Sequence, residues 1–128
     1  CDNFETRQAV NVACVKHKVP LVSGAAIRMD GQLSVYDARD DKSPCYACIF
    51  PPADAPEEVM CSTMGVLAPL VGVIGTMQAM ETVKLITGIG SRLTGRLQML
   101  DGRGMAWHEV RLQRNASCPV CGTTQSAS

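Results

Sequence analysis

The sequence predicts an α/β fold in which a mostly antiparallel sheet packs against one long helix. Strand-like segments fall in pairs within residues 19–38 and 95–114, and a helical pattern covers residues 64–88. The chain has 128 residues, within the usual range for one domain. Its 46% apolar and 19% charged residues are typical of a globular protein.

The first elements are expected to be a helix and a hairpin. Residues 3–18 place apolar side chains at Phe4, Val10, Val12, Ala13 and Val15 without a proline or glycine, and Pro20 ends the run. The segments PLVSGAAIRM and QLSVYDA then have the patterns of strands. Because Asp30-Gly31 between them is a strong turn signal, residues 25–38 predict two antiparallel strands joined there.

The middle of the chain predicts a loop followed by the long helix. FPPADAPEE, residues 50–58, has three prolines and no periodicity, which is typical of a loop. The helix is expected from Met64 to Thr87, with Gly88 as its C-cap. Small residues recur on one face of it, which predicts close packing of that face on the sheet: Gly65, Ala68, Gly72, Gly75 and Ala79.

Two further strands are expected near the C-terminus. RLQMLDG and AWHEVRL have strand patterns, and Asp101-Gly102-Arg103-Gly104 supplies the turn between them. Residues 123–128 form a short polar tail.

Composition and charge argue against two classes of partner. Lys and Arg balance Asp and Glu, and aromatic residues are few, so no surface for nucleic acid is expected. The segment 59–80 is uncharged and long enough to span a bilayer, but its polar residues, proline and flanking acidic residues favour a buried helix. No signal peptide precedes it, so we expect a cytoplasmic protein with no membrane partner.

Four of the seven cysteines form two CxxC pairs, Cys45 with Cys48 and Cys118 with Cys121. Four converging thiolates are the ligand set of a closed tetrahedral zinc site, which has a structural and not a catalytic role. The 69 residues between the pairs mean that the fold must bring them together. A redox dithiol and unrelated thiols remain alternatives.

The other three cysteines differ in their surroundings. Cys14 lies in the first helical pattern and is expected in the core, whereas Cys1 at the chain end tells nothing. Cys61 follows the proline-rich loop and precedes the long helix. A thiol near a helix N-terminus has a lowered pKa, so Cys61 is either a reactive thiol or an incidental loop residue.

An ordered set of motifs resembles the MoeB/ThiF family, the ubiquitin-activating-type enzymes that adenylate the C-terminal glycine of a small sulfur-carrier protein. The motifs are DNFETR, VPLVSGAAIRMDGQLSVY, PCYACIFP, CSTMGVLAPLVGVIGTMQAMETVKLITG and CPVCG, and the resemblance that rests on them covers essentially all of residues 1–122. The resemblance implies the C-terminal half of a Rossmann-like ubiquitin-activating-type fold. It also implies ATP and Mg as cofactors of the full-length enzyme, and a sulfur carrier as partner.

The resemblance also implies roles for single residues. Cys45, Cys48, Cys118 and Cys121 correspond to the cysteines that bind structural zinc in the family. Asp2 of the DN pattern corresponds to an aspartate near the ATP phosphates and magnesium, and Arg7 is expected near the nucleotide or the carrier tail. Cys61 corresponds to a cysteine that forms a covalent link during sulfur transfer in some members.

The chain also departs from the family pattern. The Gly-rich loop after a first strand that binds the nucleotide phosphates is not found, so we expect these 128 residues alone not to adenylate anything. We expect self-association, as a dimer, through an apolar edge. LDGRGMAWHEVRLQR with CPVCG favours the thiamine branch slightly over the molybdopterin branch. The alternative functions are a zinc-stapled interaction module and a thiol-redox protein.

Overall fold

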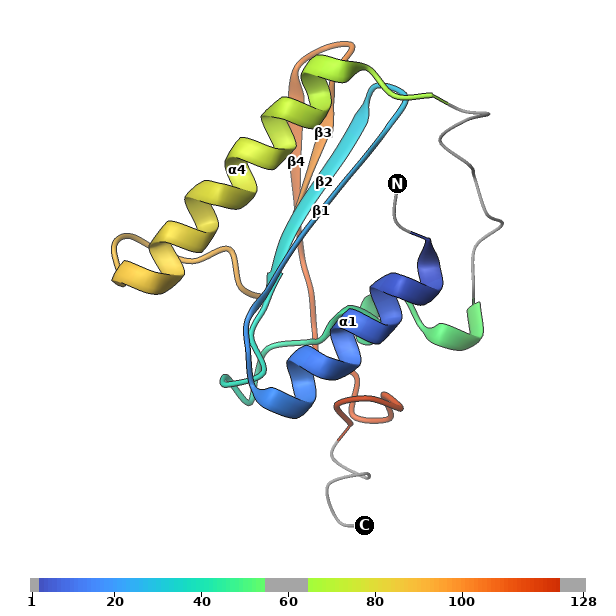
Figure 1. Cartoon of the computed structure of the whole chain (residues 1–128), viewed down its shortest axis with the longest axis vertical. Helices are drawn as coiled ribbons and strands as arrows, with labels where there is room; N and C mark the ends of the chain where they lie inside the picture. The colour runs from blue at the N-terminus through green and yellow to red at the C-terminus, as the bar shows by residue number, and fades with distance from the viewer. Residues whose placement is uncertain (1–2, 55–64, 123–128) are drawn as a thin grey trace. The chain divides into compact units, whose positions relative to one another are not determined.

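The computed structural model describes residues 3–54 and 65–122 (Figure 1). The chain divides into two compact units. One consists of residues 22–35 and 59–111, and contains most of the sheet and the long helix. The other gathers residues 1–21, 36–58 and 112–128, and therefore contains both CxxC pairs.

The sheet has four strands in the order β1-β2-β3-β4: β1 (Leu21–Ile27), β2 (Asp30–Tyr36), β3 (Arg96–Asp101) and β4 (Ala106–Arg111). The β2–β3 and β3–β4 pairs are antiparallel. Only two residues separate β1 from its neighbour β2, and so short a connection allows only antiparallel pairing. The predicted antiparallel sheet is confirmed, and the β3–β4 turn falls where the sequence predicted it.

The first hairpin turns two residues earlier than predicted. Arg28 and Met29 form the turn, and Arg28 adopts the left-handed φ of 54°. Asp30 and Gly31 lie within β2, where they pair with Asp101 and Leu100 of β3. The prediction of a turn at Asp30-Gly31 was therefore wrong.

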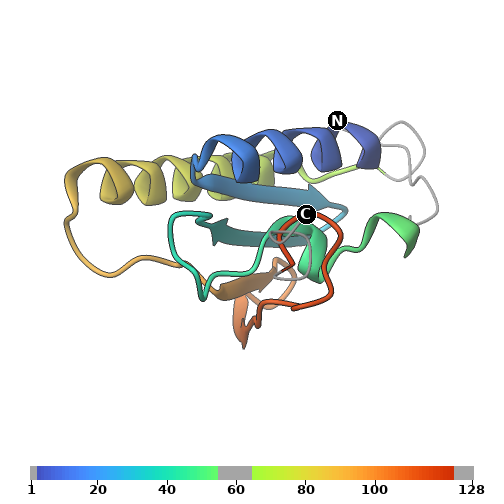
Figure 2. The same ribbon diagram turned by 90° about the horizontal axis from the view of Figure 1, so that it is seen from below.

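The long helix, α4, runs from Ala68 to Thr87 and lies against the sheet (Figures 1 and 2). It begins four residues later than predicted, because Val66 still forms a β-bridge with Arg28. Pro69 lies in the first turn, where its missing N–H costs no helical hydrogen bond. Gly88 ends the helix in the left-handed conformation, as predicted.

The glycines that permit close helix–sheet contact lie in the strands and not in the helix. Leu70 and Ile74 of α4 form a buried cluster with Leu100 of β3. A Cβ added at Gly31 would lie 2.8 Å from Cδ1 of Ile74, and one added at Gly24 would also meet that side chain at 2.8 Å.

The predicted small-residue face of α4 does not pack on the sheet. A Cβ added at Gly72 or Gly75 would meet no atom within 4 Å, and Ala68 and Ala79 are also exposed. The prediction that this face packs closely on the sheet was wrong, because the apolar residues opposite it make the contact. Within the described parts of the chain, no helix is long and apolar enough to cross a membrane.

The other unit is built around α1 (Phe4–His17), with the short helices α2 (Tyr46–Ile49) and η1 (Pro52–Asp54). Asn3 caps α1 by accepting from the backbone N–H of Thr6, and Lys18 ends it with a φ of 54°. The predicted helix is confirmed, but its buried side differs from expectation. Val10 and Val12 are exposed, whereas the polar Asn11 is buried.

Candidate metal centre

The first CxxC turn is formed by the loop after β2 and the start of α2. The backbone N–H of Asp37 donates to the hydroxyl of Ser43, which closes the loop just before Cys45. Cys45 is the N-cap of α2, and the backbone N–H of Cys48 donates to its carbonyl. Both cysteines therefore present their sulfurs at one end of a single helical turn.

The second CxxC turn depends on Asn115 and Gly122. The side chain of Asn115 accepts from the backbone N–H of Ser117, and its carbonyl accepts from that of Cys118. The N–H of Gly122 donates to the carbonyl of Cys118. A Cβ added at Gly122 would lie only 2.4 Å from that carbonyl oxygen, so only glycine fits this turn.

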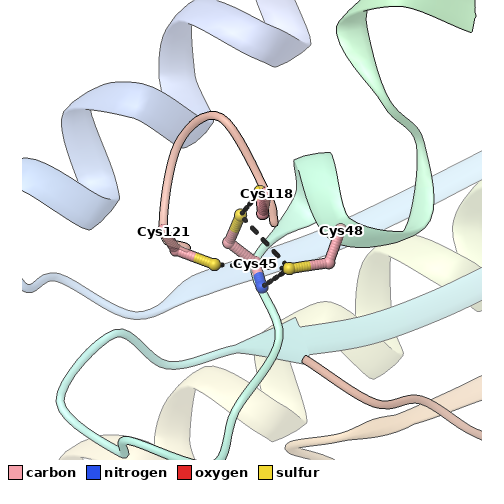
Figure 3. A group of neighbouring side chains, drawn as sticks. All are labelled: Cys45, Cys48, Cys118 and Cys121. Atoms are coloured by element: carbon pink, nitrogen blue, oxygen red, sulfur yellow. Dashed lines mark hydrogen bonds between the residues drawn. The ribbon is translucent and has the colours of Figure 1, made fainter. Parts of the chain in front are cut away.

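The structure brings the four predicted cysteines together. Sγ of Cys45 and Cys118 lie 3.6 Å apart, those of Cys48 and Cys121 lie 3.3 Å apart, and all four sulfurs fall within 4.8 Å of one another (Figure 3). Zinc bound tetrahedrally at about 2.3 Å would place its sulfurs about 3.8 Å apart. A disulfide would need about 2.05 Å. The cluster therefore matches a tetrahedral metal site, and both pairs are reduced.

Backbone N–H groups surround the sulfurs as metal thiolates require. Sγ of Cys48 accepts from the N–H of Cys45 and of Asn115, each at 3.4 Å, and Sγ of Cys118 accepts from Val120 at 3.5 Å. A thiol proton is a weak donor, whereas a thiolate accepts several hydrogen bonds. These donors stabilise negative sulfur, which is the form that binds a metal.

The pKa values of the thiols show why a cation is needed to ionise all of them. The hydrogen bond between Cys45 and Cys48 lowers the pKa of Cys48 to about 4. The same hydrogen bond, together with burial, raises the pKa of Cys45. Burial raises the pKa of Cys121 to about 11. One thiolate thus forms at the expense of its neighbours, and a divalent cation would remove that conflict.

Arg114 connects the two cysteine turns. Its guanidinium donates to the carbonyl of Asp41 at 2.6 Å and also to the carbonyl of Cys121. Asp41 lies in the loop that precedes the first pair, so one side chain fastens both segments. Arg114 was not among the predicted site residues, because an arginine after a strand has no distinctive sequence pattern.

Of the three remaining predicted site residues, the structure describes Arg7 but not Asp2 or Cys61. Asp2 and Cys61, and also Cys1, lie outside the described residues. Arg7 lies on α1, and its charge lowers the pKa of the Tyr46 hydroxyl, which burial raises more strongly. Cys14 is partly buried, and burial raises its pKa.

Comparison with known proteins decides the family. The sequence matches the profile described as the ThiF family over residues 1–120. The chain belongs to the ThiF family. It is 44% identical over 94% of its length to the molybdopterin-synthase adenylyltransferase of Escherichia coli, and 42% identical over 94% to the sulfur carrier protein ThiS adenylyltransferase of the same species.

A third relative is similar over nearly the whole chain, and a solved structure shares the fold. The chain is 46% identical over 98% of its length to the adenylyltransferase and sulfurtransferase MOCS3 of Caenorhabditis briggsae. It spans 48%, 47% and 31% of these three curated relatives, about half their length or less. The fold matches E. coli MccB with a TM-score of 0.76 at 20% identity, covering 95% of this chain and 38% of that one.

Proposed function

We propose that this chain is the zinc-binding C-terminal part of an adenylyltransferase domain, here residues 1–122, that uses ATP and Mg to activate the C-terminal glycine of a ubiquitin-like sulfur-carrier protein. Identity of 42–46% to three adenylyltransferases, over nearly the whole chain, is the observation that supports this most strongly. We expect the Gly-rich nucleotide loop to belong to a part of the full-length enzyme that these residues do not span. We place the enzyme in the cytoplasm, with no membrane or nucleic-acid partner.

Zinc is the metal that we assign to the four-cysteine cluster. Its sulfur spacing and its N–H donors fit a closed tetrahedral site. Such a site has no open position for substrate, so zinc would supply only cross-linking. Cys45 and Cys48 would be joined to Cys118 and Cys121, which fixes the C-terminal turn beside α1 and α2. This geometry favours the metal role over the redox alternative, which needs only one pair.

The nucleotide side of the proposal involves Asp2 and Arg7. We assign the Asp2 carboxylate to magnesium and the ATP phosphates, and the Arg7 guanidinium to the nucleotide or the carrier tail. The Arg7 charge acts on Tyr46, and Arg7 lies near the N-terminus of α1, the helix that begins directly after the DN motif. This position supports the assignment. Asp2→Asn should lower the rate of adenylation while zinc content stays unchanged.

Cys61 is proposed to form a covalent link with the activated carrier. Its thiolate would attack the carbonyl carbon of the acyl adenylate, AMP would leave, and a thioester would form. Cys61→Ala in the protein should keep pyrophosphate exchange and lose the thiol-sensitive adduct. Cys14→Ala, which removes a partly buried thiol, is the control and should keep both. An undiminished adduct in Cys61→Ala would exclude this role.

Self-association is supported by the exposed face of α4. The small residues Ala68, Gly72, Gly75 and Ala79 continue at helical spacing into the exposed Val83 and Ile86. We propose a homodimer that covers apolar surface of this kind. Light scattering should give twice the chain mass, and Ile86→Glu should reduce it to the single mass. A dimer unaffected by that substitution would place the interface elsewhere.

The activity itself is tested by carrier-dependent exchange of labelled pyrophosphate into ATP. We expect exchange when the complete enzyme, these 128 residues included, meets a sulfur carrier of the thiamine or molybdopterin branch. We favour the thiamine carrier, although 42% and 44% identity to the two enzymes does not decide between them. A carrier lacking its terminal glycine should support no exchange. Absence of exchange with both intact carriers would favour an interaction module instead.

A further inference from the structure

We propose that Asn11 of α1 is a positioning residue for the metal centre: its side-chain amide donates a hydrogen bond to the metal-bound thiolate of Cys45. The inference rests on the metal site proposed above. Nδ2 of Asn11 lies 3.5 Å from Sγ of Cys45. Among the described residues other than the four cysteines, Asn11 is the side chain that donates to one of the four sulfurs, whereas the other N–H donors are backbone groups.

Burial makes this contact obligatory. Asn11 is only 1% exposed, and it lies within a helix, a position that asparagine disfavours. A buried amide without partners costs about 1–3 kcal/mol, so the side chain must use the groups around it. A leucine would suit a purely apolar contact at this point in α1. The polar side chain therefore indicates a polar task.

The orientation of the amide is fixed by Tyr46. The backbone N–H of Tyr46 donates to Oδ1 of Asn11 at 3.0 Å. If the amide were turned over, its NH₂ group would face this N–H and two donors would oppose each other. Oδ1 must therefore face Tyr46, which leaves Nδ2 facing the sulfur of Cys45. A hydrogen-bond donor at this position stabilises the thiolate form of Cys45, because a thiolate accepts hydrogen bonds and donates none.

The two hydrogen bonds join α1 to the first CxxC turn at consecutive residues, Cys45 and Tyr46. Asn11 thus positions the ligand sulfur and the start of α2 with one planar group. Outer hydrogen bonds of this kind orient metal ligands, and their loss typically lowers metal affinity about 10- to 100-fold. Here the donor also links the metal centre to the helix on which Arg7 lies.

Asn11→Asp separates the two bonds, because a carboxylate can still accept from Tyr46 but cannot donate to Cys45. Gln8→Glu is the matched control. Nε2 of Gln8 donates from the same helix to the carbonyl of Phe50 at 2.6 Å, the residue that ends α2, and touches no sulfur in the described contacts. Both variants lose one amide donor between α1 and the α2 segment, and both add one charge.

The experiment uses the protein loaded with cobalt(II), whose sulfur-to-metal charge-transfer band reports the electron density on the thiolates. We expect Asn11→Asp to move the band to lower energy and to lower zinc affinity about 10- to 100-fold in competition with a chromophoric chelator. Gln8→Glu should leave the band in place, even where stability falls. A band at the wild-type energy in Asn11→Asp, with wild-type affinity, would overturn the proposal.

A measurement on the wild-type protein covers the case in which Asn11→Asp does not fold. In protein loaded with ¹¹³Cd, scalar coupling through N–H···S bonds should connect the metal to an Asn11 side-chain proton. The backbone protons of Cys45 and Asn115 provide the internal reference. Coupling to those backbone protons without coupling to Asn11 would also overturn the proposal. Failure of wild-type protein to bind cobalt or cadmium would instead refute the metal site itself.

Discussion

Sγ of Cys48 and Sγ of Cys121 lie 3.3 Å apart although 73 positions separate the two residues. The contact closes a loop that contains most of the chain. A cross-link across so long a loop restricts the unfolded chain strongly, and metal-binding free energy becomes folding free energy. The two cysteine turns, Arg114 and Asn11 together form the framework that makes the contact possible.

Cys118→Ser should unfold or severely destabilise the protein. Cys118 is fully buried within the cluster, so the substitution removes a proposed zinc ligand and leaves a hydroxyl among three thiols. We expect a loss of about 4 kcal/mol or more, together with loss of bound zinc. Cys14→Ser, outside the cluster, should keep its zinc. Chemical unfolding with parallel metal analysis makes the comparison, and zinc retained by Cys118→Ser would exclude that residue as a ligand.

Gly31→Ala and Gly72→Ala should change stability in opposite directions. A Cβ at Gly31 would press into the side chain of Ile74, and overpacking costs about 1–3 kcal/mol. A Cβ at Gly72 meets nothing within its own chain, so in the monomeric protein it should stabilise the middle of α4 by up to about 1 kcal/mol. Ile74→Val should partly rescue Gly31→Ala, because it removes the nearest atom. Equal effects in urea unfolding would contradict the packing described.

Arg114→Met should loosen the second cysteine turn. The carbonyls of Asp41 and Cys121 would lose their guanidinium donor. The exposed Asp41 carbonyl can bind water instead, whereas loss of the donor to the partly buried Cys121 carbonyl costs about 1–3 kcal/mol. Faster removal of zinc by a chelator is the expected readout. Arg103→Met, at the exposed β3–β4 turn, is the control for loss of one positive charge. The same release rate in both variants would mean that Arg114 does not hold the turn.

Zinc affinity should rise with pH across the neutral range. In the metal-free protein the raised pKa values of Cys45 and Cys121 keep both thiols protonated at pH 7, whereas Cys48, with a pKa of about 4, is already a thiolate. Binding must then release at least the two protons of Cys45 and Cys121, so affinity should increase at least about 100-fold per pH unit. Calorimetry in buffers of different ionisation enthalpy counts the protons released on zinc binding. Zinc binding without proton release would refute this prediction.

Sequence patterns predicted the elements better than the contacts between them. Local chemistry predicts the helix ends at Lys18 and Gly88 and the antiparallel strands. It also predicts that the two cysteines of each CxxC motif lie on one turn. Local chemistry does not predict which glycines permit close packing, because Gly31 and Gly72 look alike until the position of Ile74 is known. Asn11 was missed for the same reason: only the fold places Cys45 and Tyr46 beside it.

Native mass spectrometry of protein purified without chelator tests the central feature most directly, the joining of the two CxxC pairs by one metal ion. The sulfur geometry predicts one zinc per chain, with Cys45, Cys48, Cys118 and Cys121 protected from alkylation until the zinc is removed. Zinc-free protein whose mass is lower by about two units for each disulfide formed would contradict it and support a redox protein instead.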